Sequence, residues 1–313
     1  MLSYVAARIL AGIPTLLLVS IFIFSLVHMT PGDPAILLAG DNATPAQVEA
    51  IRARLHLDLP IWEQFALWFG DAVQLDLGDS VYSGKPVTEL IAQRIEPTLV
   101  LSLFTLLLTV AIAIPLGAIS AWKANSLVDR LAMGFATLGF SIPVFAIAYI
   151  MVYLFAVEWR LFPVQGYKPL SGGILTTLHS VTLPSIALAL VFSALIARVT
   201  RASVLDALGE NYIRTARAKG LGAPRILFIH ALKSVGVPVI TVVGIGLATL
   251  IGGVVVTESV FNIPGIGRLT VDAITRRDYP VIQGVILFFS ASLIFINLIV
   301  DLSYALIDPR VRG

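Results

Sequence analysis

Six long stretches without a charged side chain constrain the fold of this chain more than any other feature. They contain no Asp, Glu, Lys or Arg, are 22 to 29 residues long, and run over 9–32, 97–122, 131–157, 169–197, 234–257 and 279–300. A helix of about 20 predominantly apolar residues crosses a hydrocarbon core of roughly 30 Å and satisfies its own backbone hydrogen bonds. The sequence therefore predicts an all-α polytopic membrane protein with six transmembrane helices.

The composition excludes several other classes of protein. Of the 313 residues, 58% are hydrophobic and 13% are charged, whereas an average soluble domain carries roughly 25% charged residues. The formal net charge is only +2, so no basic field of the kind that binds nucleic acid is expected. The chain has no cysteine, which excludes disulfides, thiolate nucleophiles and cysteine-bound metal sites.

The distribution of positive charge orients the predicted helices. If the N-terminus is cytoplasmic, the cytoplasmic side holds 12 Lys and Arg residues, and the short loops of the opposite side hold 5. Because Lys and Arg in short loops favour the cytoplasmic side, both termini are predicted to be cytoplasmic. The first stretch could instead be a secretory signal, but it is long for one and no A-x-A cleavage site follows it closely.

These assignments divide the chain into three parts. Residues 1–27 form the N-terminus and first helix, 28–96 an external helical cap, and 97–313 a core of five helices. Within the core we expect helices at about 98–121, 131–157, about 178–197, about 235–257 and about 281–301, a cytoplasmic loop at 198–233, an external loop at 258–280 and a cytoplasmic tail at 302–313.

The cap is predicted to contain two helices. Thr44, Pro45 and Gln47 form the capping box and first turn of a helix that runs through Leu55. Pro60 opens a second, amphipathic helix with aromatic residues at helical spacing, Trp62, Phe65, Trp68 and Phe69. These aromatic side chains either pack locally or form a docking surface for an external partner.

The cytoplasmic loop 198–233 carries a third of the basic residues, yet its Asn, Gly and Pro residues are placed as at the ends of folded helices. Asn211 is expected to cap a helix that runs through Lys219, where Gly220 ends it. Gly222 allows a second sharp bend, and Pro224 starts the next helix.

The predicted helix in this loop has two different faces. Glu210, Arg214 and Arg217 share one face at spacings of four and three residues, and the other face is small or apolar, with Ile213, Ala216 and Gly220. The pattern suits a folded contact element. It also suits a solvated loop that merely carries the positive charge of a cytoplasmic face.

Motifs for chemistry by the chain itself are absent from the sequence. There is no GxxxxGK[ST] phosphate loop, no HExxH and no GxSxG, and the six predicted spans contain no charged side chain that could relay protons. Two classes of function remain: a substrate pathway driven by a separate motor, and a channel or passive scaffold. No catalytic residue and no metal ligand set is predicted.

Small and hydroxyl side chains mark a candidate pathway. Thr241 and Thr249 lie in the glycine-rich fifth span, and Ser141 precedes Pro143 at a predicted kink in the third. Such residues either line a polar cavity or permit close helix packing.

The segment from Asn211 to Gly220, NYIRTARAKG, resembles the cytoplasmic coupling loop of ABC-importer permeases of the dipeptide, oligopeptide and nickel branch. The resemblance spans nearly the whole chain. It includes HMTPGDP at 28–34, ESVFNIPGIGR at 258–268, RDYPV at 277–281 and DPR at 308–310.

The coupling loop departs from the general permease pattern, which is Glu-Ala-Ala, three residues, Gly, nine residues and Ile-x-Leu-Pro. Anchored on Gly220, the chain keeps Ala216 and Leu232. It has other residues at the remaining positions, with Arg214 for the Glu, Thr215 for the first Ala, His230 for the Ile and Lys233 for the Pro. These departures resemble those of the peptide branch.

The resemblance implies six helices of the type I ABC importer permease kind, with a helical external cap between the first and second, in the inner membrane of a bacterium. It implies a heterodimer with a second permease subunit, two ATP-binding subunits that bind ATP and magnesium, and an external substrate-binding protein. No cofactor is expected on this chain. The substrate would be a small peptide or, in close relatives, glutathione or chelated nickel.

The resemblance also assigns two sets of site residues. The segment that couples to the ATPase would comprise Asn211, Tyr212, Arg214, Thr215, Ala216, Arg217, Lys219, Gly220, Gly222 and Pro224. The external gate or docking loop would comprise Glu258, Phe261, Pro264, Gly265, Gly267 and Arg268. Because substrate would enter opposite the coupling loop, this loop and the acidic cap residues Asp71, Asp76 and Asp79 either receive the binding protein or merely seal the outer ends of the helices.

Overall fold

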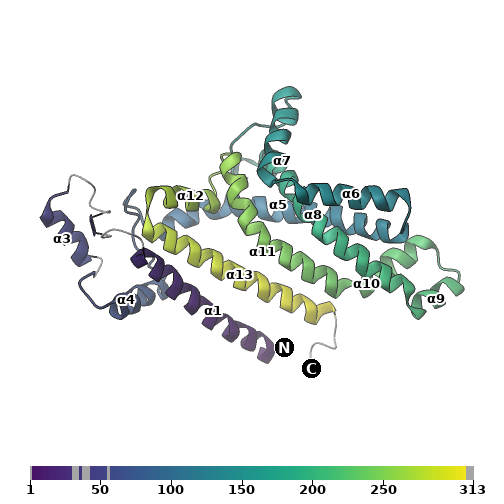
Figure 1. Cartoon of the computed structure of the whole chain (residues 1–313), viewed down its shortest axis with the longest axis horizontal. Helices are drawn as coiled ribbons and strands as arrows, with labels where there is room; N and C mark the ends of the chain where they lie inside the picture. The colour runs from purple at the N-terminus through teal and green to yellow at the C-terminus, as the bar shows by residue number, and fades with distance from the viewer. Residues whose placement is uncertain (1, 30–34, 37–42, 55–56, 308–313) are drawn as a thin grey trace. The chain divides into compact units, whose positions relative to one another are not determined.

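The computed structural model describes residues 2–29, 35–36, 43–54 and 57–307, and these ranges are almost entirely helical (Figure 1). The motifs at 28–34 and 308–310 lie largely or wholly outside them. The helices are α1 (Leu2–Met29), α3 (Pro45–Arg54), α4 (Ile61–Val73), α5 (Val87–Trp122), α6 (Leu127–Ser141), α7 (Val144–Met151), the π-helix η1 (Val152–Glu158), the 3-10 turn η2 (Leu170–Gly172), α8 (Ile174–Gly209), α9 (Asn211–Ala218), the π-helix η3 (Arg225–Ala231), α10 (Leu232–Ser234), α11 (Gly236–Val260), α12 (Ile266–Arg276) and α13 (Tyr279–Ile307).

Among the residues that the structure describes, four helices are long and apolar enough to cross a membrane: α5, α8, α11 and α13. A fifth span results if α6 is joined to the helix at 144–158, although the two axes meet at 102°. The apolar part of α1 among the described residues, Leu10–Leu26, is shorter. The all-helical fold is thus confirmed, whereas the exact number of six spans stays a prediction.

The predicted third helix at 131–157 is broken at Ile142 and Pro143. Both residues adopt extended backbone angles, with ψ of 129° and 138°. A proline disfavours the helical conformation of the residue before it, and its own nitrogen cannot donate the next helical hydrogen bond. The kink expected here is therefore a complete break between α6 and α7.

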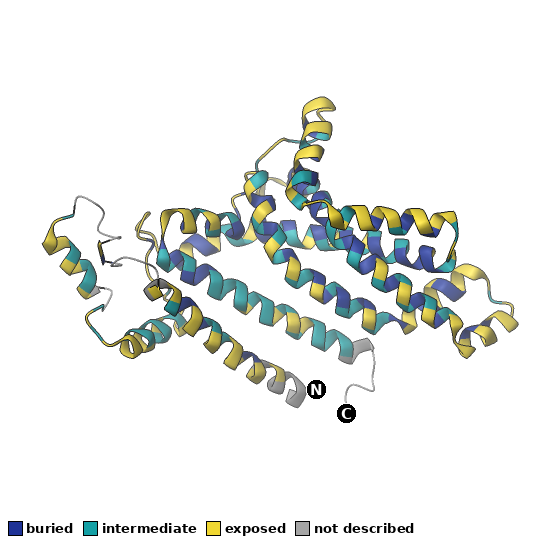
Figure 2. Cartoon of the chain, in the orientation of Figure 1, coloured by how far each residue is buried: buried dark blue, intermediate teal, exposed yellow. Residues whose placement is uncertain are grey.

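The chain divides into two compact units, and each is described by itself. The first comprises residues 95–268 with 295–313, and the second comprises 2–94 with 269–294. In the first unit α8 is the central helix, because 67% of its apolar window is buried, against 33% for α11. Buried positions recur along α8, while the outer face of α6 is exposed (Figure 2).

Small side chains bring α5, α6 and α8 close together. A Cβ atom added at Gly117 of α5 would lie 2.5 Å from the carbonyl oxygen of Ala197 in α8, and one added at Gly139 of α6 would lie 2.8 Å from the carbonyl oxygen of Leu190. Glycine and alanine at such positions let helix backbones approach within van der Waals contact, which is the main source of helix association in lipid.

In the second unit, α3 and α4 lie where the sequence predicts two helices, whereas their role as an external cap stays a prediction. The Thr44 amide donates to Oε1 of Gln47 at 2.8 Å and the Gln47 amide donates to Thr44 Oγ1 at 3.4 Å, which is a capping box. Phe24 of α1 packs on Phe65 and Trp68 of α4 with ring centroids 5.4 and 5.8 Å apart. Part of the aromatic face of α4 therefore packs locally, whereas Trp62 is 70% exposed.

A turn at residues 76–86 is fixed to the start of α13 in the same unit. The buried carboxylate of Asp278 accepts hydrogen bonds from Ser80 Oγ at 2.6 Å and from the Val81 amide at 3.2 Å. The Arg276 guanidinium lies 3.9 Å from the centroid of the Tyr82 ring, within cation–π range. This part of the cap is consequently an ordered structure and not a plain connector.

The α5–α8 contact yields a stability prediction. Gly117→Ala should lower the apparent melting temperature of the purified protein in detergent, because the added methyl group overpacks the helix contact at a cost of about 1–3 kcal/mol. Gly134→Ala is the matched control, since Gly134 also lies in a helix and an added Cβ meets nothing within 4 Å. Equal melting temperatures for the two variants would contradict the close approach.

Candidate functional site

The predicted coupling segment is a folded, amphipathic unit at one end of α8. In α9 the side chains of Ile213 and Ala216 are buried, while Arg214 and Arg217 are exposed. The apolar face packs in a cluster with residues of α5, α8 and η3: Ala118, Ala121, Val204, Ala207, Ile226, Leu227 and Ala231. The segment is therefore packed structure rather than a solvated loop.

Asn211 is not the cap of this helix. The N-cap position is occupied by Glu210, whose backbone is extended at ψ 152° and whose side chain makes no capping hydrogen bond, and Asn211 is the first helical residue. The prediction relied on the preference of Asn for N-cap positions. The observed start is one residue earlier because α8 ends at Gly209 and Glu210 alone forms the junction between the two helices.

Gly220 ends α9 as predicted. Its φ is +76°, the Gly220 amide donates to the Arg217 carbonyl at 2.9 Å, and the Leu221 amide donates to the Ala216 carbonyl at 3.2 Å. This is the hydrogen-bond pattern of a Schellman cap, which favours glycine at the left-handed position. Gly222 does not form a second bend of this kind: it is not among the glycines with positive φ, and its carbonyl accepts from the Ile226 amide at 3.1 Å.

Two side-chain contacts fix α9 to its neighbours. The hydroxyl groups of Tyr212 and Ser234 lie 2.7 Å apart, which joins α9 to α10. The guanidinium of Arg217 lies 5.8 Å from the ring centroid of Trp122, the last residue of α5. The remaining predicted residues Thr215, Lys219 and Pro224 are exposed, and Thr215 Oγ1 donates to the Asn211 carbonyl at 3.1 Å.

The predicted external loop is organised around a buried carboxylate. Glu258 is fully buried at the end of α11, where its Oε1 accepts from Thr98 Oγ1 at 2.6 Å and its Oε2 accepts from the Arg268 amide at 3.0 Å. Thr98 Oγ1 in turn accepts from the Ile266 amide at 2.8 Å. A buried carboxylate is costly unless such donors surround it.

The glycines of this loop are required by the same carboxylate. A Cβ atom at Gly265 would collide with the carboxylate of Glu258, and one at Gly267 would lie 2.6 Å from Cα of Val255. Phe261 is only 2% exposed and lies in the core cluster, so it anchors the loop instead of presenting a docking surface. Pro264 is exposed, and the Arg268 guanidinium donates to the side chain of Asn262.

Glu96 is a residue that the sequence patterns did not single out. Its Oε1 accepts from the Tyr167 hydroxyl at 2.8 Å and from the Leu170 amide at 2.9 Å, which fixes the segment between η1 and α8 to α5. Burial, followed by the bond to Glu96, raises the pKa of the Tyr167 phenol above its ordinary value. The Gly166 amide also donates to the Phe261 carbonyl at 2.9 Å, so this segment and the loop after α11 are joined.

Two of the three predicted pathway residues line one hollow of about 400 Å³. It lies at the break between α6 and α7, and its lining includes Ser141, Thr249 and apolar side chains of α8, Leu188, Val191 and Phe192. Ser141 Oγ donates to the Thr137 carbonyl at 2.8 Å, and Thr249 Oγ1 donates to the Ile245 carbonyl at 2.5 Å. Thr241 lies elsewhere and accepts from the Tyr304 hydroxyl at 2.9 Å.

Within the described part of the chain, no three His, Asp or Glu side chains gather as a metal site.

Comparisons with known proteins cover the whole chain. The family model described as "Binding-protein-dependent transport system inner membrane component" matches residues 113–313, and the model of the N-terminal part of such membrane components matches residues 1–102. The probable peptide ABC transporter permease protein y4tP of Sinorhizobium fredii is 47% identical over 309 residues, covering 99% of each chain. The glutathione transport system permease protein GsiC of Escherichia coli K12 is 43% identical over 312 residues, covering 100% of this chain and 99% of the relative.

A solved structure agrees with the fold. A chain of the MetNI methionine ABC transporter, solved in inward-facing conformations, superposes with a TM-score of 0.60 at 17% identity and covers 70% of this chain and 96% of that chain. At this identity the similarity concerns the fold alone.

The hydrogen bonds that join Glu258, Thr98 and the amides of Ile266 and Arg268, which we call the Glu258 cage, yield a second stability prediction. Thr98→Val should lower the apparent melting temperature, because it removes the donor to a buried carboxylate and the acceptor of the Ile266 amide, at about 1–3 kcal/mol for each unsatisfied group. Thr137→Val is the matched control, since Thr137 is exposed and its hydroxyl bonds only to the Met133 carbonyl of its own helix. Variants with the same melting temperature would show that the cage adds no stability.

Proposed function

This chain belongs to the family of binding-protein-dependent transport system inner membrane components, and we propose that it forms half of the translocation pathway of an importer for small peptides. As a member of that family it is a multi-pass permease subunit of an ABC importer. A second permease subunit would complete the pathway as a heterodimer. Two ATPase subunits would supply the energy, and an external binding protein would deliver the substrate.

The observation that supports peptides is the 47% identity, over nearly all of both chains, to a probable peptide ABC transporter permease. The second candidate substrate is glutathione, supported by 43% identity to a glutathione permease over a similar length. Glutathione is itself a tripeptide, so the two candidates share charged termini and amide groups. A permease whose binding protein selects the substrate needs few specific contacts along its own pathway.

Uptake by the complete transporter distinguishes the candidates. The four membrane and ATPase subunits and the binding protein would be reconstituted in proteoliposomes with a labelled dipeptide, and unlabelled glutathione or a nickel–histidine chelate would be added as competitor. We expect ATP-dependent dipeptide uptake that other dipeptides inhibit. Strong inhibition by glutathione alone, or by the nickel chelate alone, would reassign the substrate.

We propose that α9 is the element that the ATPase contacts. Arg214 and Arg217 are exposed on it, Arg217 with its guanidinium also beside the Trp122 ring, and Lys219 and Gly220 form its capped end. Because α9 follows α8 through a single junction residue, Glu210, and continues through η3 and α10 to α11, a displacement of α9 would be passed to two long helices. Rigid-body movement of helices of this kind underlies alternating access. ATP and magnesium would be bound by the ATPase subunits, because the chain has no phosphate loop.

We propose that the loop after α11 and the cap receive the binding protein on the opposite side of the membrane. In the loop, Asn262 and Pro264 are exposed around the Glu258 cage, which would hold them in one conformation. In the cap, Asp71, Asp76 and Asp79 are all exposed, and Asp76 also accepts a hydrogen bond from the Gly78 amide at 2.9 Å. Both docking assignments rest on the proposed cytoplasmic position of α9, because the binding protein would deliver substrate from the other side of the membrane.

The coupling role of α9 can be tested at Gly220. Gly220→Glu should reduce substrate uptake by at least about tenfold with membrane insertion intact, because a non-glycine residue at positive φ costs about 1–2 kcal/mol and the carboxylate reverses the local charge. Gly172→Glu is the control, since Gly172 is an exposed glycine without positive φ that lies outside the coupling segment.

Three outcomes separate the functional classes. Loss of uptake and of ATPase association only in Gly220→Glu supports coupling. Parent-like uptake in both variants would favour a scaffold, and a conductance from the chain alone in liposomes would favour a channel.

The proposed orientation can be tested by cysteine labelling, since the chain has no native cysteine. Single cysteines at the exposed positions Ser83, Lys123, Ala223 and Thr275 would be treated with an impermeant thiol reagent in cells whose inner membrane is intact. Positions 83 and 275 should react, and positions 123 and 223 should react only after permeabilisation. Labelling of position 223 in intact cells would reverse the orientation.

A further inference from the structure

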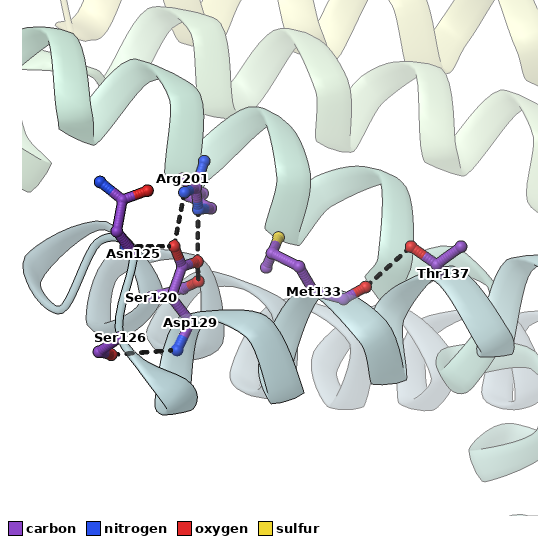
Figure 3. A network of polar contacts seen from close by, with 7 residues as sticks. All are labelled: Ser120, Asn125, Ser126, Asp129, Met133, Thr137 and Arg201. Atoms are coloured by element: carbon purple, nitrogen blue, oxygen red, sulfur yellow. Dashed lines mark hydrogen bonds and ion pairs between the residues drawn. The ribbon is translucent and has the colours of Figure 1, made fainter.

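A buried ion pair joins three helices close to α9. Asp129, in the first turn of α6, is 4% exposed, and its two carboxylate oxygens accept from Nε and Nη2 of Arg201 in α8, each at 2.6 Å (Figure 3). The same carboxylate accepts from Ser120 Oγ of α5 and from the Asn125 amide at 2.9 Å in the α5–α6 turn. We refer to Asp129, Arg201, Ser120 and Asn125 as the clamp.

The clamp is a specific geometric link. A bidentate guanidinium–carboxylate pair fixes both the distance and the relative orientation of two planar groups, which apolar contacts do not. Two further donors occupy the remaining lone pairs of Asp129, so the buried charge is fully solvated by protein groups. The α5–α6 turn is shaped to supply one of them, since Asn125 adopts a φ of +64°.

The clamp lies between the long helices and α9. On the α8 side, Arg201 is followed by two helical turns that end at Gly209, directly before the Glu210 junction. On the α5 side, Gly117 lies against Ala197 one turn before Arg201, and Trp122 stacks on Arg217 of α9. The apolar cluster beneath α9 includes Ala118 and Ala121 of α5, so α9 touches the same end of α5 that the clamp fixes to α8.

We propose that the clamp is a positioning device that makes the α5–α6 turn move as one body with α8 and α9. The inference rests on the proposed coupling role of α9. In the absence of the clamp, a displacement of α9 would reach α8 and α11 directly but would act on α5 and α6 through apolar contacts and the Arg217–Trp122 contact, which do not fix the relative orientation of these helices as a bidentate ion pair does. With the clamp, the same displacement also moves α5 and α6. Asp129 and Arg201 are positioning residues, because they act through the helices that they join.

Two variants and two matched controls test the proposal in the reconstituted transporter. Asp129→Asn removes the charge, and Arg201→Lys keeps the charge but loses the fork that binds both oxygens. Asp206→Asn and Arg130→Lys make the same chemical changes at exposed positions. The ratio of dipeptide transported to ATP hydrolysed should fall by at least about fivefold in the two clamp variants and stay at the parent value in the controls, since coupling changes of about 0.5–2 kcal/mol correspond to about 2–30-fold.

A distance measurement tests the single-body movement without reference to transport. Spin labels at Lys123→Cys in the α5–α6 turn and Glu210→Cys at the α8–α9 junction occupy exposed positions. In the parent complex the distance distribution between them should be narrow and the same in the nucleotide-free and ATP-bound states. In Arg201→Lys it should broaden or shift when ATP binds.

The outcomes are distinguishable. Parent-like coupling ratios together with an unchanged narrow distribution in both clamp variants would overturn the inference while leaving the proposed function intact. If Asp129→Asn does not accumulate in the membrane, Arg201→Lys decides alone. A parent chain that neither binds the ATPase subunits nor transports any probe would overturn the proposed function, and the inference with it.

Discussion

The burial of carboxyl groups is the physical constraint on which much of this structure depends. Moving a carboxylate out of water costs several kcal/mol unless donors occupy its lone pairs. Glu258 and Asp129 are both buried, and each gathers donors from segments far apart in the chain. Glu258 joins the end of α11 to Thr98 of α5 and to the loop at 265–268, and Asp129 joins the start of α6 to α5 and α8. The polar cages thus fix helix ends, whereas small residues determine how closely the helices pack between them.

The helix α8 joins the other helices of the first unit, because it contacts several of them and is followed directly by α9. It is the most buried of the four long apolar helices, it contacts α6, α7 and α11, and it continues through one residue into α9. Small side chains along its length permit close approach, and Arg201 fixes its register against α6. A helix that is both central and continuous with a surface element is suited to transmit a displacement, because its backbone hydrogen bonds resist compression and bending.

The sequence predicted those parts of the structure that depend on local chemistry. Gaps between charged residues located the long helices, the Thr44–Gln47 pair predicted a capping box, and Gly220 predicted the end of α9. The capping box and the end of α9 each depend on residues within about one helical turn of one another, and the long helices depend on uninterrupted runs of the sequence. The Asn211 cap was predicted wrongly because the preference of Asn for N-cap positions does not take account of where the preceding helix ends: α8 ends at Gly209, which leaves Glu210 as the residue between the two helices. The loop residue Phe261 is buried, which a hydropathy pattern at a helix end does not reveal.

The contacts that sequence patterns missed join distant positions. Thr98 and Glu258 are 160 residues apart, and Asp129 and Arg201 are 72 residues apart. Each residue alone is an ordinary charged or hydroxyl side chain of a helix, so only the packing of the helices shows which pairs meet. At Ile142 and Pro143 the sequence did predict the position of the break, because of the proline. It did not predict the angle of 102° between α6 and the helix that follows, because that angle depends on what the two half-helices pack against.

The hydroxyl groups of Ser141 and Thr249 give the hollow at the α6–α7 break a definite chemical polarity. Each hydroxyl has one proton and donates it to a carbonyl of its own helix, so it presents only oxygen lone pairs outward. The remaining lining is mainly apolar. Such a surface treats the two ends of a solute with an ammonium and a carboxylate group differently: it can accept hydrogen bonds from the ammonium end, but these two residues offer the carboxylate end no donor. The hollow would therefore interact more favourably with the ammonium end of a zwitterion than with its carboxylate end.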